Sequence, residues 1–193
     1  STSNLHHFFF PYTSQKLLGP STTKYLDILY FDLFKKLNIQ SLVECGAYEA
    51  SGSIEAIKRG CNAYAIEANP NTFKKITPKS NGKLTSMNIG LSDKPGYLNF
   101  YFPKKNNTEI SLTFQKKEGT EYETIKVLTQ TLDSVIKKFD IISNPYTLWI
   151  DVEGFQKQVL FGAKKILADK NCKLIKIEVE EIEKFKGQSF LSE

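Results

Sequence analysis

The sequence predicts an α/β fold with a mostly parallel sheet, helices on both faces and an antiparallel strand insertion. Short apolar and β-branched runs alternate with stretches of helical periodicity in residues 41–90, and again in residues 146–179. Between them, residues 96–130 change to the alternation of apolar and polar side chains that is typical of antiparallel strands. The length of 193 residues is that of one globular domain.

The chain is expected to begin with an irregular lead-in and a helix, in residues 1–40. Proline and glycine interrupt any pattern up to residue 20. Ser21 or Thr22 can cap the helix that follows. Its apolar stripe, which we expect to pack on the core, consists of Tyr25, Leu26, Leu29, Tyr30, Leu33, Phe34 and Leu37.

The main domain is expected in residues 41–193. Buried strands are predicted at residues 41–45, 63–66, 84–89, 147–152 and 174–179. Helices are predicted at residues 53–59, after an N-cap at Asn71, at residues 132–139 and at residues 156–167.

The middle segment, residues 96–130, is predicted to form antiparallel strands that extend or flank the sheet. Alternation recurs at residues 97–102, 110–114 and 125–127. We interpret the polar loops 104–109 and 116–124 as solvated connectors, and a role in facing a substrate is the alternative.

Acidic side chains end three of the parallel strands: Glu44, Glu67 and Asp151. A buried charge is costly unless it is paired or hydrogen-bonded, so acids that recur at one edge of a sheet need a reason. Helix capping and lysine pairing would be one. A ligand is the other, because in open α/β sheets ligands bind at the carboxyl ends of the strands.

The acidic turn at the far end of the strand predicted at residues 147–152 is the predicted centre of an active site. Asp151 and Glu153 are two residues apart, so in a strand they would project from the same side. We expect one of these two carboxylates to act as the catalytic base.

The turn after the first strand favours a cofactor without phosphates. It has the pattern E-x-G-x-x-x-x-x-G and lacks the G-x-G-x-x-G that brings a pyrophosphate onto a helix N-terminus. Gly46 would allow close backbone approach, and Glu67, about twenty residues on, would bind ribose hydroxyls. S-adenosylmethionine has a ribose, an adenine and an amino-acid end that fit this arrangement.

Composition narrows the classes of partner. The net charge of +5 comes almost wholly from scattered lysines, since Arg59 is the single arginine, so nucleic acid is not the expected partner. The basic balance is expected to be a solvated surface, and steering of an anionic substrate is the alternative. No apolar run is long enough to span a membrane and no signal peptide is recognised, so we expect a cytoplasmic protein. The three cysteines are expected to be reduced core thiols.

Several blocks resemble, in order, those of FkbM-type S-adenosylmethionine-dependent methyltransferases. They are residues 43–48, 65–70, 90–93, 131–133, 150–155 and 159–163. The resemblance covers about residues 41–180. The block I-D-V-E-G followed by V-L-x-G-A is its most specific part.

The resemblance implies a Rossmann-like class I methyltransferase fold and O-methylation of a carbohydrate or natural-product hydroxyl. The cofactor residues that it implies are Glu44, Gly46, Ala47 and Tyr48 for the methionine part, Glu67 and Ala68 for the ribose, and Asn88, Gly90, Leu91 and Ser92 for the adenine side. Asp151 would lie near the reacting methyl group, with Glu153 as the second catalytic carboxylate.

The chain departs from the family pattern at several positions. Glu44 replaces the usual Asp, Tyr48 stands where Asn is common, Ala50 where a second glycine is expected, and Trp149 where Lys is frequent. The sequence ends soon after the fifth strand, whereas the fold normally adds two more. We therefore expect either a trimmed version or two further strands from residues 96–130.

Three points stay open in the sequence. Mg²⁺ is possible but not favoured, because two acids on one strand are only part of an oxygen-rich site, and no metal ligand is assigned. The expected acceptor is a glycan or other small molecule, while a nucleic-acid methyltransferase and a non-catalytic binding module are the alternatives. The oligomeric state is not determined by the sequence.

Overall fold

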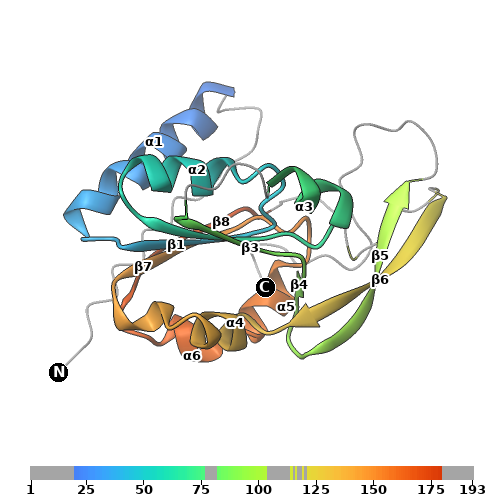
Figure 1. The fold of residues 1–193 in the computed structure, drawn as a ribbon. Coiled ribbons are helices and arrows are strands. Elements are labelled where there is room, and N and C mark those ends of the chain that lie inside the picture. Colours follow the sequence, from blue (N-terminus) through green and yellow to red (C-terminus); the bar gives the residue numbers. More distant parts are fainter. Residues whose placement is uncertain are drawn as a thin grey trace.

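The computed structural model describes residues 20–76, 82–103, 114, 116, 119 and 121–179, with the side chains of residues 20–24 and 103 left aside. Its centre is a five-stranded parallel sheet (Figure 1). In spatial order the strands are β3 (Leu84–Met87), β2 (Asn62–Ile66), β1 (Ser41–Cys45), β7 (Tyr146–Ile150) and β8 (Cys172–Ile177). The predicted Rossmann-like fold is confirmed.

The strand order reverses between β1 and β7. From β1 the chain runs outward through β2 to β3, and it later returns to the other side of β1 to form β7 and then β8. Ligands bind open α/β sheets at such a switch point, outside the carboxyl ends of the strands. The site is therefore to be sought where β1 and β7 end.

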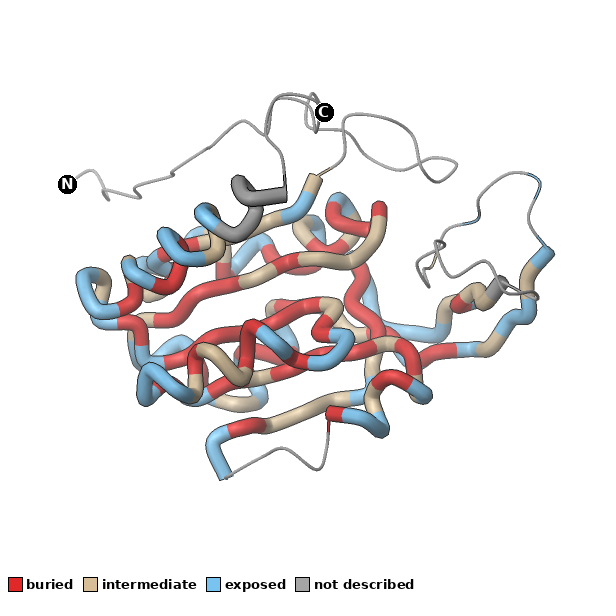
Figure 2. Tube along the Cα trace, turned by 90° about the horizontal axis from the view of Figure 1, so that it is seen from above, coloured by how far each residue is buried: buried red, intermediate tan, exposed pale blue. Residues whose placement is uncertain are grey.

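Helices cover both faces of this sheet (Figure 1). One face carries α1 (Pro20–Lys36), α2 (Ser51–Lys58) and α3 (Pro70–Ile76). The other carries α4 (Leu132–Lys138), the short 3-10 helix η2 (Ile141–Ser143), α5 (Gln156–Phe161) and α6 (Lys164–Leu167). Because both faces are covered, every residue of β1 is buried, and buried positions run along the sheet (Figure 2).

Helix α1 is anchored to the sheet by aromatic packing and by one ion pair. Tyr30 is buried and its hydroxyl lies 2.8 Å from the Thr147 hydroxyl. Lys176 of β8 binds Asp27 of α1 at 2.5 Å, and its ammonium lies 3.2 Å from the centre of the Trp149 ring. Trp149, which stands at the position where the family often has lysine, is therefore covered by α1.

A second, three-stranded sheet lies beside the first (Figure 1). It contains β4 (Gly90–Leu91), β6 (Tyr122–Gln130) and β5 (Gly96–Pro103) in that order, with β5 and β6 antiparallel. Residues 96–130 thus flank the parallel sheet, which is one of the two predicted arrangements, and do not add strands to it, because β5 pairs with β6 and β6 pairs also with β4. The strand predicted at residues 110–114 lies, except for Phe114, outside the described residues.

Two local predictions are corrected by hydrogen bonding. The cap of α3 is Asn69, not Asn71: the Asn69 side-chain oxygen accepts the Asn71 N–H at 2.9 Å, with Pro70 as the first helical residue. The helix predicted over residues 156–167 is split at Gly162. α5 ends before Gly162 and α6 begins after Ala163, and a Cβ on Gly162 would lie 2.2 Å from the Ser92 carbonyl oxygen, so glycine is required at this break.

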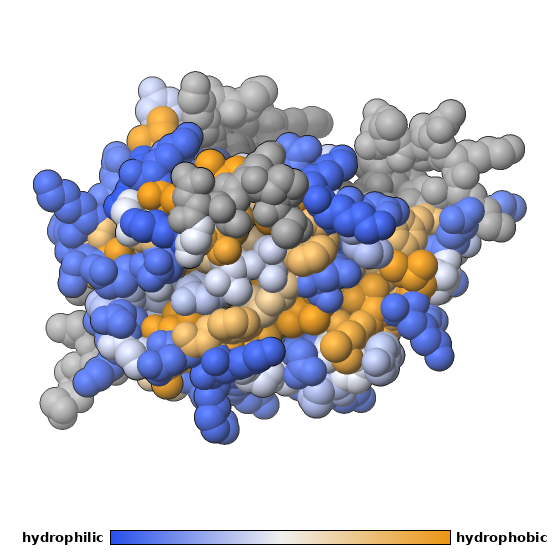
Figure 3. Space-filling model, in the orientation of Figure 1, coloured by the Kyte–Doolittle hydropathy of each residue, from blue (hydrophilic) through white to orange (hydrophobic). Residues whose placement is uncertain are grey.

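The described core contains all three cysteines, buried and unpaired with one another as predicted. On the α4 side the core is formed by residues such as Val43, Leu132 and Leu148, and on the α1 side by Tyr30, Phe34 and Leu42. Apolar side chains also gather where the β5–β6 hairpin joins the rest of the molecule (Figure 3).

Candidate active site

The turns that follow β1 and β7 touch at the switch point. Gly46 has φ +78, and a Cβ built on it would lie 1.8 Å from the Asp151 carbonyl oxygen. The Asp151 N–H in turn donates to the Cys45 carbonyl at 2.9 Å. Only glycine fits at Gly46, because the backbone conformation and the contact both exclude a side chain.

Glu44 holds the start of α2 rather than projecting from the rim of the site, which is the edge of the sheet where the parallel strands have their carboxyl ends. Its two carboxylate oxygens accept the N–H groups of Gly52 at 3.0 Å and Ser53 at 2.7 Å. Burial raises the pKa of this carboxyl, and the hydrogen bonds from Ser53 and Gly52 oppose the rise. Both oxygens of the Glu44 carboxylate thus bind N–H groups at the start of α2, and its predicted cofactor contact stays a prediction.

Glu67 connects the end of β2 to the glycine turn. One carboxylate oxygen accepts the Tyr48 N–H at 2.7 Å, and the other accepts the Asn69 N–H at 2.7 Å. Burial raises the pKa of Glu67, while these backbone hydrogen bonds counter the shift. Asn88 lies next to it, since the Asn88 amide donates to the backbone carbonyls of Glu67 at 2.8 Å and Ala68 at 3.2 Å. The structure therefore brings these four predicted cofactor residues together.

The remaining predicted cofactor residues are mostly buried. Ala47 is in the core, and its N–H donates to the Ile66 carbonyl. Gly90 and Leu91 form β4, where a Cβ on Gly90 would meet the Phe114 ring at 2.4 Å. Ser92 is also buried and donates its hydroxyl to Asp93 at 2.9 Å. These contacts are structural, and Asn88 is the exposed member of the group predicted for the adenine side.

Tyr48 and Ala50 explain two of the departures from the family pattern. Both have left-handed backbone conformations, with φ of 48 and 57. Asn and Gly adopt this conformation at low cost, which is the physical reason for Asn and Gly at these two positions. The turn keeps the conformation here despite Tyr and Ala.

Replacing Tyr48 with glycine should stabilise the protein. Tyr48 is 62% exposed, so little packing is lost, whereas left-handed strain of about 1 kcal/mol is relieved. Urea unfolding should show a higher midpoint for Tyr48→Gly. Glu49→Gly is the matched control, because Glu49 lies in the same turn without a positive φ and should lose stability. Equal losses in both variants would contradict the prediction.

Asp151 is an acid of the rim whose pKa is raised far above its ordinary value. Burial raises its pKa to about 8, followed by the charge of Glu178, a hydrogen bond to Glu178 and the charge of Glu153, while Lys176 lowers it. The Glu178 N–H donates to the Ile150 carbonyl at 2.9 Å, so the residue that follows β8 lies beside the residue that follows β7. Glu178 is exposed, and its position directly after a strand parallel to β7 is the signal in the sequence that indicates its proximity to Asp151.

The geometry predicted for Glu153 is wrong. Strand β7 ends at Ile150, so the alternation that would place Asp151 and Glu153 on one side does not continue. Glu153 instead has φ 47 and precedes Gly154 with φ 84, in a tight left-handed turn. Its charge still acts on Asp151, after that of Glu178.

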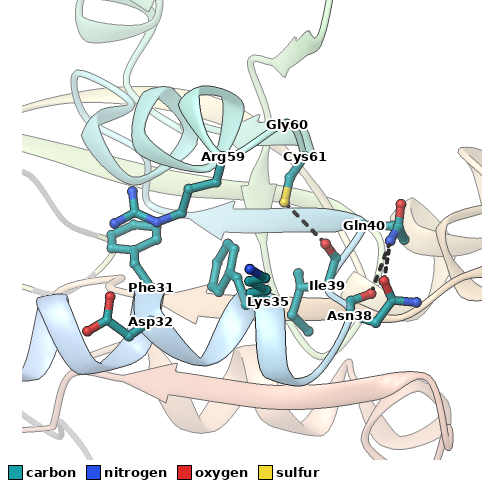
Figure 4. Close-up of a pocket in the computed structure, with 10 residues that line it drawn as sticks. Phe31, Asp32, Lys35, Asn38, Ile39, Gln40, Arg59, Gly60 and Cys61 are labelled. Carbon is teal, nitrogen blue, oxygen red and sulfur yellow. Dashed lines mark hydrogen bonds between the residues drawn. The ribbon is translucent and has the colours of Figure 1, made fainter.

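A hollow of about 520 Å³ lies at the opposite, amino-terminal edge of the sheet (Figure 4). Side chains of α1 and the end of α2 line it, including Phe31, Lys35 and Arg59. Cys61 points toward the Ile39 carbonyl there and donates to it at 3.3 Å. This hollow contains no residue of the predicted site. Within residues 20–76, 82–103 and 121–179, no group of three or more His, Cys, Asp or Glu side chains could hold a metal ion.

An open parallel sheet with this strand order, a glycine turn at its switch point and an acid at the end of β2 defines the Rossmann-like class of α/β proteins. The chain belongs to the FkbM methyltransferase family, since the Methyltransferase FkbM domain matches residues 44–192. The protein is therefore a methyltransferase-family member, as the sequence blocks indicated.

A more distant similarity was found to the hexuronic acid methyltransferase AglP of Haloferax volcanii. The identity is 28% over 120 residues, which are 60% of this chain and 47% of that protein. The chain thus spans about half the length of this curated relative. No solved structure matched the chain. Among the described helices, none is long and apolar enough to cross a membrane.

Proposed function

We propose that the protein uses S-adenosylmethionine to methylate a hydroxyl group of a carbohydrate or small natural product. The observation that carries the proposal is the position of Glu67, whose buried carboxylate lies at the end of β2 and is bound to the glycine turn at the switch point. An acid at this place can accept hydrogen bonds from the two ribose hydroxyls of a nucleoside.

The residues of the rim fit this cofactor. Gly46 brings the turn after β1 against the Asp151 carbonyl, and the methionine part would be held by this turn. The ribose would bind Glu67, and the exposed Asn88 lies on the adenine side. When bound, S-adenosylmethionine supplies an electrophilic methyl group on a positively charged sulfur.

Asp151 is the group proposed to accept the proton of the acceptor hydroxyl. Its raised pKa of about 8 makes the ionised form a stronger base than an ordinary aspartate, and the ionised fraction grows as the pH approaches 8. Proton acceptance contributes about 10²- to 10⁴-fold to such reactions. Positioning of the two bound partners contributes more, roughly 7–11 kcal/mol of the barrier.

A carbohydrate acceptor is supported by the relative from Haloferax volcanii, whose name gives hexuronic acid as its substrate. The rim of this chain is rich in carboxyl groups, which favour hydroxyl donors as ligands. We therefore propose a polyhydroxylated acceptor, with the sugar itself not specified.

Two measurements test the proposal. Calorimetric titration with S-adenosylmethionine should show saturable binding, and its demethylated product should compete. Incubation with methyl-labelled cofactor and a panel of neutral and acidic glycans should transfer label to at least one. Absence of cofactor binding at high micromolar concentration would refute the proposed cofactor.

Glu67→Gln should weaken S-adenosylmethionine binding by about 10- to 100-fold, because hydrogen bonds to a charged acceptor contribute about 1.5–3 kcal/mol. Calorimetry at a temperature where both proteins are folded measures the change. Glu55→Gln removes the same charge from an exposed site on α2 and should leave the affinity unchanged. An unchanged affinity in Glu67→Gln would show that the ribose assignment is wrong.

A further inference from the structure

The end of β8 brings a second carboxyl group to Asp151. Ile150 and Ile177 are register partners, so Asp151 and Glu178 follow neighbouring parallel strands at the same level. Such strands lie about 4.8 Å apart, the Glu178 N–H donates to the Ile150 carbonyl at 2.9 Å, and the charge of Glu178 and a side-chain hydrogen bond to it help to raise the pKa of Asp151. A hydrogen bond between two carboxyl groups requires one proton, which the pair must share.

The charged groups around Asp151 and Glu178 do not favour ionisation of both carboxyl groups. Glu153 approaches from the turn after β7 and adds negative charge. Lys176 precedes Glu178 on β8, but its ammonium is bound to Asp27 of α1 and lies over the Trp149 ring. Lys176, the cation of the described residues that lowers the pKa of Asp151, is thus already engaged by α1, and its influence is smaller than that of Glu178.

Gln156 supplies an independent observation at the same place. Its side chain is 5% exposed and donates from the amide nitrogen to the Glu178 carbonyl at 2.8 Å. Within the part of the chain that the structure describes, the oxygen of the same carboxamide has no hydrogen-bond donor. A buried acceptor without a donor is costly, so this oxygen indicates a ligand that brings an O–H or N–H group.

We propose that Asp151 and Glu178 form a carboxyl pair holding one proton, and that this pair and the Gln156 carboxamide oxygen bind an acceptor with two neighbouring hydroxyl groups. This inference rests on the proposed function and deepens it. The ionised member of the pair accepts the proton of the reacting hydroxyl. The Gln156 oxygen accepts a hydrogen bond from the adjacent hydroxyl and fixes the orientation of the acceptor.

The step balances in atoms and charge. The hydroxyl oxygen forms a bond to the methyl carbon as the bond between that carbon and sulfur breaks. The electron pair of the broken bond stays on sulfur, which becomes a neutral thioether. The proton of the hydroxyl passes to the carboxyl pair, which afterwards releases it to water. A vicinal diol of a sugar ring supplies one hydroxyl donor to the carboxyl pair and a second to the Gln156 carboxamide oxygen, whereas an isolated hydroxyl leaves Gln156 without a donor.

The carboxyl pair can be tested without cofactor or acceptor. In the full chain labelled with ¹³C at aspartate carboxyls, the Asp151 signal is identified by its loss in Asp151→Asn. It should titrate near pH 8. Glu178→Gln should lower this midpoint by about one pH unit or more, because both the charge and the shared proton are removed. Glu55→Gln serves as the charge-matched control and should not move it.

Two results would overturn the pair: an unchanged midpoint in Glu178→Gln, or an equal or larger shift in Glu153→Gln. Neither result depends on whether S-adenosylmethionine binds, so failure of the pair and failure of the proposed function are distinguishable.

The acceptor class is tested with trans-1,2-cyclohexanediol and cyclohexanol as probes and methyl-labelled S-adenosylmethionine. The wild-type protein should label the diol at least tenfold faster than the mono-alcohol. Gln156→Met should reduce this preference without abolishing cofactor binding. No transfer to the diol, equal transfer to both probes, or a preference unchanged in Gln156→Met would overturn the diol assignment.

Discussion

Gly46→Ala should destabilise the protein by about 3–5 kcal/mol, because left-handed strain adds to an overlap with backbone that cannot move freely. The added Cβ would lie 1.8 Å from the Asp151 carbonyl oxygen. To relieve the overlap, the turn after β1 must separate from the turn after β7. Urea unfolding measures the loss, and calorimetry on any folded fraction should show that S-adenosylmethionine binding is lost with it.

Gly60→Ala is the matched control. Gly60 has φ +89, similar to Gly46, but a Cβ there meets nothing within 4 Å. It should therefore lose about 1 kcal/mol, the cost of the left-handed conformation by itself. If both variants lose the same stability, the contact between the two turns does not determine the role of Gly46.

Asp151→Asn should change both turnover and the pH dependence of stability. Turnover should fall about 10²- to 10⁴-fold while cofactor affinity changes little, because an amide cannot accept the proton. The pKa of Asp151 is raised in the folded state from 3.8 to about 8. The native protein therefore retains a proton that the unfolded chain releases, so the contribution of Asp151 to stability is complete below about pH 4 and is lost as the pH rises toward 8.

Asp151→Asn does not undergo the loss of stability that ionisation of Asp151 causes. Its free energy of unfolding should therefore exceed that of the wild type above pH 8, by on the order of 2 kcal/mol. Urea unfolding at pH 5 and pH 9 checks the sign. Burial also raises the pKa of Glu44 and Glu67, so the difference between variant and wild type, rather than the wild-type slope, is the diagnostic quantity. A variant less stable than wild type at pH 9 would contradict the assignment. Turnover equal to wild type would remove Asp151 as the base.

The family blocks explain why the places of Gly46 and Glu67 in the fold could be predicted. Gly46 and Glu67 lie at the carboxyl ends of strands whose order follows from alternating strands and helices, and the structure connects both through one turn. Glu44 shows the limit of such reasoning. In sequence, an acid that faces a ligand cannot be distinguished from an acid that binds the first N–H groups of the next helix. The hydrogen bonds of Glu44 show that it does the latter.

The sequence by itself determined the alternation of strands and helices, the glycine turn and the acids at the strand ends, because these depend on periodicity and on neighbours along the chain. Only the tertiary structure decided that Asp151 lies beside Glu178, that the β5–β6 hairpin leaves the parallel sheet, and that α1 covers Trp149. Each of these joins residues far apart in sequence. Their contacts depend on strand register and on helix docking, which local pattern does not encode.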